Sequence, residues 1–133
     1  MRKLSIGLVS ILILGLVACN SDPVTEPNKN SEVVLGVKSV ELPQQAQATA
    51  PLDITVEVIV GGCISFNRLE VVSRTASQLN LRAIGTNSEK PGIVCTADIR
   101  WQKVPYTDPG SPARNNLFEV LVSGTSWGKI SIQ

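Results

Sequence analysis

The chain has 133 residues, of which 17% are charged and 4% aromatic, with no histidine and a formal net charge of +1. This near-neutral balance gives no basic surface for a phosphate backbone, which argues against nucleic acid as a partner. The lack of histidine removes the commonest general base and the usual zinc ligand, so we expect no metal site and no cofactor.

Residues 1–18 are predicted to be a lipoprotein signal peptide. Arg2 and Lys3 form a basic start, and an apolar run follows from Leu4 to Val17. As a helix this run would be about 21 Å long, whereas the hydrocarbon core of a bilayer is roughly 30 Å thick, so the alternative of a transmembrane helix is disfavoured. A basic start, a short apolar middle and small residues before the cut are typical of a signal peptide.

Leu-Val-Ala-Cys at 16–19 matches the lipobox of a bacterial lipoprotein precursor. This motif predicts cleavage before Cys19 and a diacylglyceryl group on its thiol; secretion with an unmodified cysteine is the alternative. Asn20 follows in place of the aspartate that commonly retains such proteins at the inner membrane, which favours the outer membrane if the source has two. Cleavage removes two of the twelve basic residues, leaving ten against eleven acidic ones.

Residues 19–31 are predicted to be the lipidated cysteine and a flexible tether. The segment 20–31, NSDPVTEPNKNS, has Val24 as its sole sizeable apolar residue, too little to offset the entropy lost on ordering. A random coil of this length spans on the order of 20 Å. The remaining residues, 32–133, suit one domain.

The pattern of this domain has the period of strands. Four stretches alternate as strands do. Three more strands are expected near Val33–Leu42, within Ile64–Thr75 and at Trp127–Ile132, which brings the number to about seven. No window after the signal peptide has the apolar spacing of a useful helix. Four stretches alternate apolar with other residues: Ile54, Val56, Val58 and Val60; Leu79, Leu81 and Ala83; Cys95, Ala97, Ile99 and Trp101; and Phe118, Val120 and Val122.

The strand within Ile64–Thr75 changes phase. Ile64 and Phe66 share one parity, and Leu69 and Val71 have the other. A bulge near residues 67–68 would return both pairs to the core. The alternative is two short strands separated at that point.

About seven short strands in a hundred residues predict an all-β antiparallel sandwich, with an open barrel as the alternative. Cys63 and Cys95 remain beside the acylated Cys19, and an even pair in an oxidising compartment usually forms a disulfide. It would close a loop of about 33 residues, worth roughly 3.7 kcal/mol in the chain-entropy model. The alternative of a redox or metal pair lacks a CxxC motif and a histidine.

Three framework motifs, VEVIVGGCISF at 56–66, VCTA at 94–97 and LFEVLVSG at 117–124, carry a resemblance. With them, nearly all of residues 33–133 resembles small immunoglobulin-like bacterial proteins that are lipid-anchored or secreted. The resemblance implies an immunoglobulin-like β-sandwich and no particular activity. Antibody-type domains match less well, because no tryptophan lies between the cysteines and Ile93 replaces the tyrosine of a tyrosine corner.

No candidate catalytic residue emerges, and we expect that the protein is not an enzyme. The sequence has no glycine-rich phosphate loop and no nucleophile elbow. Ser126 and Lys129 match the S-x-x-K motif by letter, but they lie in a predicted strand and not at a helix start. Trp101 and Trp127 are expected to pack rather than to stack on sugars. Four carboxylates lie at the polar phases of their strands and are expected to be solvated: Asp53, Glu57, Asp98 and Glu119.

The best candidate for a binding surface is the loop predicted at 105–116, PYTDPGSPARNN. Loops on rigid scaffolds often carry binding residues, and the candidates here are Tyr106, Asp108 and Arg114. A passive connector is the alternative, and the loop at 87–92 is a second choice.

The sequence therefore predicts a lipid-anchored cell-envelope protein that acts as a non-enzymatic binding or structural accessory module. The membrane, through the lipid on Cys19, and an envelope protein are its expected partners. One hypothesis is a protein-interaction module that uses the 105–116 loop, of which an inhibitor of an envelope protease is a narrower form. The other is a carbohydrate or small-ligand binder that uses an exposed tryptophan.

Overall fold

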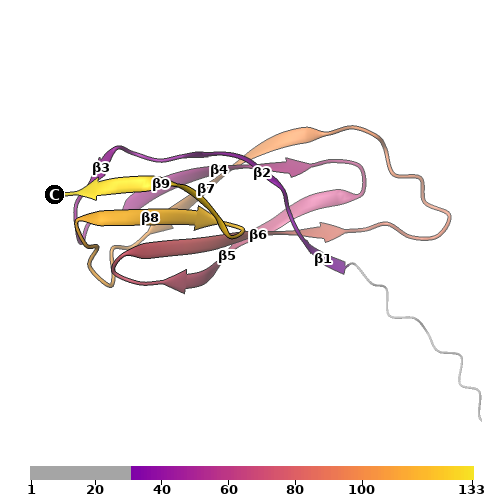
Figure 1. The fold of residues 1–133 in the computed structure, drawn as a ribbon. Helices are drawn as coiled ribbons and strands as arrows, with labels where there is room; N and C mark the ends of the chain where they lie inside the picture. The colour runs from indigo at the N-terminus through magenta and orange to yellow at the C-terminus, as the bar shows by residue number, and fades with distance from the viewer. Residues whose placement is uncertain (1–30) are drawn as a thin grey trace, which may run out of the picture.

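The structure, a computed structural model, describes residues 31–133, which form nine β-strands and no helix (Figure 1). The all-β prediction is confirmed, with more strands than the seven expected. The predicted signal peptide, the lipidated Cys19 and the tether up to residue 30 lie outside the described residues. The strands are β1 (Ser31–Val34), β2 (Val37–Glu41), β3 (Gln45–Ala46), β4 (Leu52–Val60), β5 (Ile64–Arg74), β6 (Gln78–Asn87), β7 (Arg100–Asp108), β8 (Leu117–Val122) and β9 (Thr125–Ile132).

Two sheets share one apolar core. The larger sheet has six strands, connected in the order β1-β6-β8-β9-β3. β1 and β8 pair with different parts of one edge of β6, and β5 pairs with its other edge. The smaller sheet has the order β2-β4-β7. Buried side chains from both sheets form a single cluster, so the sheets face each other across it. Within residues 31–133 the strands form two separate sheets, so the alternative of one open barrel is wrong.

Alternation identifies the central strands correctly. Every even-numbered residue of β4 from Leu52 to Val60 is buried, and β8 buries Phe118, Val120 and Val122 in the same manner. In β6 the predicted residues Leu79, Leu81 and Ala83 are all fully buried. Because burying one such side chain stabilises a fold by about 1.5–3 kcal/mol, these strands supply most of the hydrophobic stabilisation.

Two strand pairs are parallel, although the sequence predicted an antiparallel arrangement. β3 pairs in parallel with β9, and β6 pairs in parallel with β8. After β6 the chain forms β7 in the smaller sheet and then returns to the larger sheet as β8, running in the same direction as β6. Side-chain alternation has the same period in both kinds of pair, so it could not reveal this crossover.

The predicted strand at Val33–Leu42 is two strands in different sheets. β1 pairs with β6, and β2 pairs with β4. Between them, the amide of Leu35 donates to the carbonyl of Ala83, while the carbonyl of Gly36 accepts from the amide of Ile59, both at 2.9 Å. The chain therefore crosses from one sheet to the other at these two residues, with Leu35 buried in the core.

The predicted bulge in β5 is confirmed, because the register with β6 shifts between Phe66 and Arg68. It places Phe66 and Leu69 against the core. Ile64, which shares the parity of Phe66, and Val71, which shares that of Leu69, stay at the surface, with 37% and 45% of their area exposed. The bulge thus returns one member of each pair to the core, not both. A second register shift lies between Val71 and Ser73.

The predicted strand from Cys95 to Trp101 is wrong for most of its length. Residues 88–99 are a loop, and β7 begins only at Arg100, opposite Val60 of β4. The residues of this stretch that were expected to face the core are half-buried or exposed, and the buried positions of β7 come later, at Val104 and Asp108.

Candidate functional site

The predicted binding residues lie mostly inside the protein. β7 extends to Asp108, so the connection to β8 is residues 109–116 rather than the predicted 105–116. Tyr106 packs against the core from β7. Asp108 and Arg114 are buried, with 1% and 4% of their surface exposed.

Asp108 is held between two arginines from different parts of the chain. Arg74, the last residue of β5, donates from Nε and Nη2 to the two carboxylate oxygens at 2.7 and 2.9 Å. Arg114 donates from Nη2 to the same carboxylate. Burial raises the pKa of Asp108, but the hydrogen bonds and charges of both guanidinium groups outweigh this, so its pKa lies below the ordinary value.

The second arginine also binds backbone carbonyls. Arg114 Nη1 donates at 2.8 Å to the carbonyls of Gln47 and Ala50, in the connection between β3 and β4. Both guanidinium groups lie over the ring of Phe118, at 4.6 Å for Arg74 and 5.4 Å for Arg114. Carbonyl dipoles and a ring face thus offset the one positive charge that Asp108 leaves unbalanced.

This cluster, Arg74, Asp108 and Arg114, fixes the 109–116 connection to its neighbours. The amide of Arg114 donates to the carbonyl of Ala48, and that of Asn115 donates to the carbonyl of Ala76. The interpretation of Asp108 and Arg114 as partner contacts therefore needs correction, because neither has exposed surface to offer. Asp108 shares the parity of Val104 and Tyr106 within β7, which hints at an inward position, but the sequence pattern did not reveal the two arginines that make its burial possible.

A disulfide and two glycines form the base of a different loop. Cys63 and Cys95 are bonded, as predicted, with their Cα atoms 5.2 Å apart. Gly61, with φ of 135°, has room for no side chain, because a Cβ would lie 2.1 Å from the carbonyl oxygen of Asp98. Gly62, with φ of 60°, faces the carbonyl of Thr96 in the same manner. The turn between β4 and β5 therefore packs closely against residues 95–98, and the disulfide joins the two segments.

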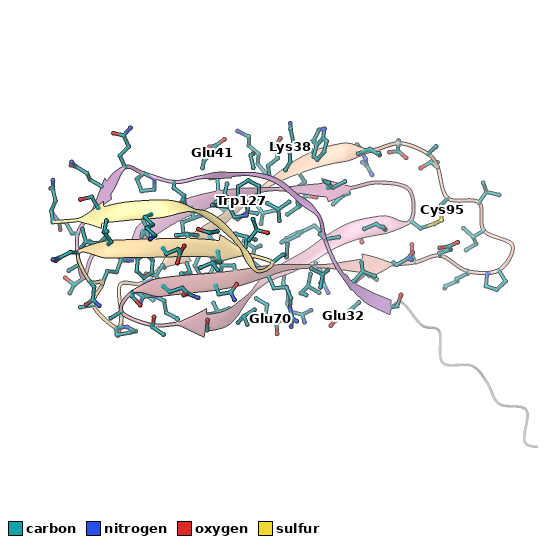
Figure 2. All side chains as sticks on the ribbon, viewed as in Figure 1. Glu32, Lys38, Glu41, Glu70, Cys95 and Trp127 are labelled. Carbon is teal, nitrogen blue, oxygen red and sulfur yellow. A yellow bond between two sulfur atoms is a disulfide. The ribbon has the colours of Figure 1, made fainter. Side chains whose placement is uncertain are left out.

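The loop at residues 88–99, here called the apolar loop, exposes large hydrophobic side chains. Val94 is 91%, Ile99 69% and Ile93 53% exposed. A single exposed hydrophobic residue is ordinary on a protein surface, but several in one projecting loop indicate a contact surface. Figure 2 labels Cys95 at the base of this loop. The sequence pattern concealed it, because the same residues alternate as a strand would.

The described chain begins beside the apolar loop. Ser31, the first residue of β1, pairs with Asn87, the last residue of β6 before the loop. Figure 1 shows β1 and this loop at one end of the molecule and the C-terminus at the other. Whatever precedes Ser31 therefore joins the domain at the end where the apolar side chains project.

The carboxylates expected to be solvated are bonded to their neighbours. Asp53 accepts from Thr107 Oγ1, and Asp98 pairs with Arg100 at 3.1 Å. The hydrogen bond from Ser39 and the charge of Lys38 hold the pKa of Glu57 below its ordinary value. Within residues 31–133, acidic side chains and cysteines form no group of three that could hold a metal ion.

The residues of the S-x-x-K match, Ser126 and Lys129, lie in a strand, as predicted, and not at a helix start. Ser126 lies in β9 and donates to Glu119 of β8 at 2.7 Å, so its hydroxyl faces a carboxylate across a strand pair. The tight β8–β9 turn, with positive φ at Ser123 and Gly124, sets this pairing.

The two tryptophans differ in what they offer to a ligand. Trp127 is half-buried and packs against the core. Trp101 is 47% exposed, but the ammonium of Lys38 lies 4.7 Å from its ring centroid. A sugar could stack on that face only if Lys38 moved aside.

A shallow groove of about 350 Å³ lies on the larger sheet. It falls where β1 and β8 share one edge of β6, because β1 pairs with residues 84–87 of β6 and β8 with residues 78–81. Its lining combines apolar side chains with a guanidinium group: Val34, Val72, Asn80, Leu81, Arg82, Ser123 and Gly124.

Comparison with known proteins gave no match to a protein-family model, a curated protein or a solved structure. Among the described residues no helix is long and apolar enough to cross a membrane.

Proposed function

We propose that this chain is a lipid-anchored protein of the cell envelope that acts as a non-enzymatic binding module, and that the apolar loop is its contact surface. The anchor is proposed at Cys19, in the lipobox at 16–19. The domain, residues 32–133, is proposed to be a sandwich of the immunoglobulin-like type, as the motifs around Cys63 and Cys95 suggest. Two facing sheets with one core support this proposal.

One observation carries the proposal of a contact surface. Ile93, Val94 and Ile99 project from a loop whose base is fixed by the disulfide and by the turn at Gly61 and Gly62. A fixed base limits the conformational entropy that the loop loses on binding. Exposure of such side chains costs solubility, so a contact that buries them is the favoured explanation.

The experiment places a photo-crosslinking amino acid at position 94 of the full-length protein in intact cells. The control places it at Leu117, which is also apolar and exposed, at 59%, but pairs with Ser131 at the opposite end of the domain. Adducts with envelope components at 94 and not at 117 support the proposal. Equal labelling at both positions, or none at 94, overturns the loop as the contact surface.

The anchor is tested separately. In cells that express the Cys19→Ser variant, the protein should leave the membrane fraction, and mass spectrometry of the wild-type N-terminal peptide should find a diacylglyceryl group on Cys19. A wild-type protein without lipid on this cysteine would contradict the anchor.

A small-ligand binder is the second candidate, and the groove on the larger sheet favours it. Val34 and Val72, which line it, are 55% and 52% exposed, and Arg82 lines it as well, paired with Glu70 at 3.0 Å. A negative group of a ligand would compete with Glu70 for this guanidinium. A ligand with an apolar body and a negative group would suit this lining. Calorimetric titration with anionic sugars and small acids, beside the Arg82→Ala variant, tests it: binding that the substitution removes supports this candidate.

A further inference from the structure

We infer that the apolar loop docks on the surface of the same bilayer that holds the lipid anchor. This inference rests on the proposed anchor at Cys19 and names what the loop contacts. A lipid surface, rather than a protein, is chosen because of where the chain outside the described residues joins the domain.

The point where the chain joins the domain puts the apolar loop nearer the anchor than the opposite end of the domain. Only eleven residues lie between Cys19 and Ser31, so twelve residue-to-residue steps join them. Even a fully extended chain of this length reaches at most about 43 Å, and a domain of this size has a radius of gyration of about 13 Å. Since Ser31 pairs with Asn87 at the start of the apolar loop, the end of the domain that lies nearest the anchor is the end that carries Val94.

The composition of the loop suits the bilayer interface. From Ile93 to Ala97 the sequence is Ile-Val-Cys-Thr-Ala, without a charge. Loop backbone needs water or protein partners for its polar groups, so it cannot enter the hydrocarbon core without cost. Docking would therefore place Ile93, Val94 and Ile99 at the boundary of headgroups and acyl chains and leave the loop backbone hydrated.

The charges around the loop give no strong electrostatic preference. Lys90 and Arg100 are balanced by Glu89 and Asp98, and Arg100 pairs with Asp98 at 3.1 Å. Burial of apolar surface is thus the main attraction. We expect docking to depend little on salt and on the share of anionic lipid, unlike association through a basic patch.

The loop would orient the domain, because a two-chain lipid already supplies the affinity of the anchor. With the apolar loop on the membrane, the C-terminal end of β9 and the start of β8 point away from it (Figure 1). The loop becomes a second attachment point, and two points fix an orientation that a tether alone leaves free.

The test uses the full lipidated protein reconstituted in vesicles of phosphatidylethanolamine and phosphatidylglycerol, with acyl chains brominated to quench tryptophan. Val94→Trp is compared with the matched control Leu117→Trp, and the wild type, with Trp101 and Trp127, gives the background. The emission added at 94 should be quenched several-fold more than that added at 117. Equal quenching at the two positions would overturn the inference.

A further variant tests whether the tryptophan itself draws the loop to the lipid. Adding Ile93→Asp and Ile99→Asp to the Val94→Trp protein should remove most of its quenching, because it places charge in the apolar contact. Quenching that persists would show that the native side chains do not carry the docking, and the inference would fail.

The outcomes separate the inference from the proposed function. A wild-type protein that does not float with the vesicles has no anchor, and both proposals fail. A protein that floats while the emission of the Val94→Trp variant stays unquenched refutes docking alone. Crosslinks from position 94 to an envelope protein, with no quenching, would keep the loop as a contact surface and replace the lipid by that protein.

Discussion

At the scale of single residues, the most constrained group is the carboxylate of Asp108. It is buried between two guanidinium groups that come from β5 and from the connection before β8. Such a cluster gains little over an apolar core of the same size, but removing one member leaves the others buried without compensation. Its role in this fold is to hold a segment that has few apolar side chains to bury.

Replacing Asp108 by asparagine should lower the free energy of unfolding by about 3–5 kcal/mol, because Arg74 and Arg114 then lose their counter-charge. Urea denaturation followed by tryptophan fluorescence measures it. Asp53→Asn is the matched control: this aspartate is exposed on the same strand pair, and its change should stay within about 0.5 kcal/mol. Equal effects of the two substitutions would refute this role of the cluster.

The same carboxylate should make stability depend on pH in acid. The pKa of Asp108 in the folded state is lower than its ordinary value of 3.8. Between the two values the unfolded chain binds the proton and the folded chain does not, so stability falls as the pH drops through this range. The stability difference between wild type and Asp108→Asn should therefore be constant at neutral pH and shrink below about pH 4. Denaturation curves at a series of pH values measure it, and a constant difference down to pH 2 would contradict it.

At the scale of elements, the edge strands are protected from pairing with other chains. β5 is bonded only to β6 among the described strands, and its two register shifts interrupt a regular edge. β7 is bonded only to β4, and Pro105 within it has no amide to donate. Bulges and edge prolines of this kind oppose aggregation. The apolar loop, which has no such protection, is therefore the more notable exposed surface.

Removing the disulfide should destabilise the element that carries the apolar loop. Replacing both Cys63 and Cys95 by alanine should lower the free energy of unfolding by roughly 3–4 kcal/mol, because the unfolded chain regains the conformational freedom that the disulfide-closed loop had removed. Chemical denaturation measures the loss. The wild type under reducing conditions should match the double variant. If reduction left the denaturation midpoint unchanged, the bond would contribute no stability.

At the scale of the whole molecule, ion pairs lie along the strands, and the two most exposed large apolar side chains among the described residues, Val94 and Ile99, lie in the apolar loop. Ion pairs lie on the outer faces of the strands, such as Glu32 with Arg68 and Glu70 with Arg82; Figure 2 labels the two glutamates. Exposed pairs of this kind contribute little stability, but they keep the faces hydrated. The strands also expose apolar side chains, such as Val34 and Leu117, but the loop places three of them together at one end, which gives the molecule a direction. This direction is what the proposed anchoring and docking would use.

Much of the core could be predicted from the sequence. The apolar residues of β4, β6 and β8 are buried as their alternation indicates, and the pairing of Cys63 with Cys95 was predicted from the two cysteines that remain beside the predicted lipidation site. The bulge in β5 was also visible, because a change of parity within one strand requires an extra residue.

The candidate site was predicted less well. Tyr106, Asp108 and Arg114 were selected as residue types that are frequent at binding surfaces, but type does not determine exposure. Asp108 is buried because the guanidinium groups of Arg74, which is distant in sequence, and of Arg114 compensate its charge, and alternation cannot report such partners. The alternation from Cys95 to Ile99 was misinterpreted as a strand because a periodic segment forms a strand only where a neighbouring strand is present to pair with it, and within residues 31–133 this segment has none.

The sequence by itself determined the all-β class, the buried strands and the disulfide, because each depends on local period, residue type or number; the lipid anchor rests on the sequence alone and stays a proposal. Only the tertiary structure decided the parallel pairing of β6 with β8, the burial of Asp108 and the exposure of Val94. These depend on which distant segments meet. Contacts across the sheets are set by the packing of the whole chain, and no local pattern contains them.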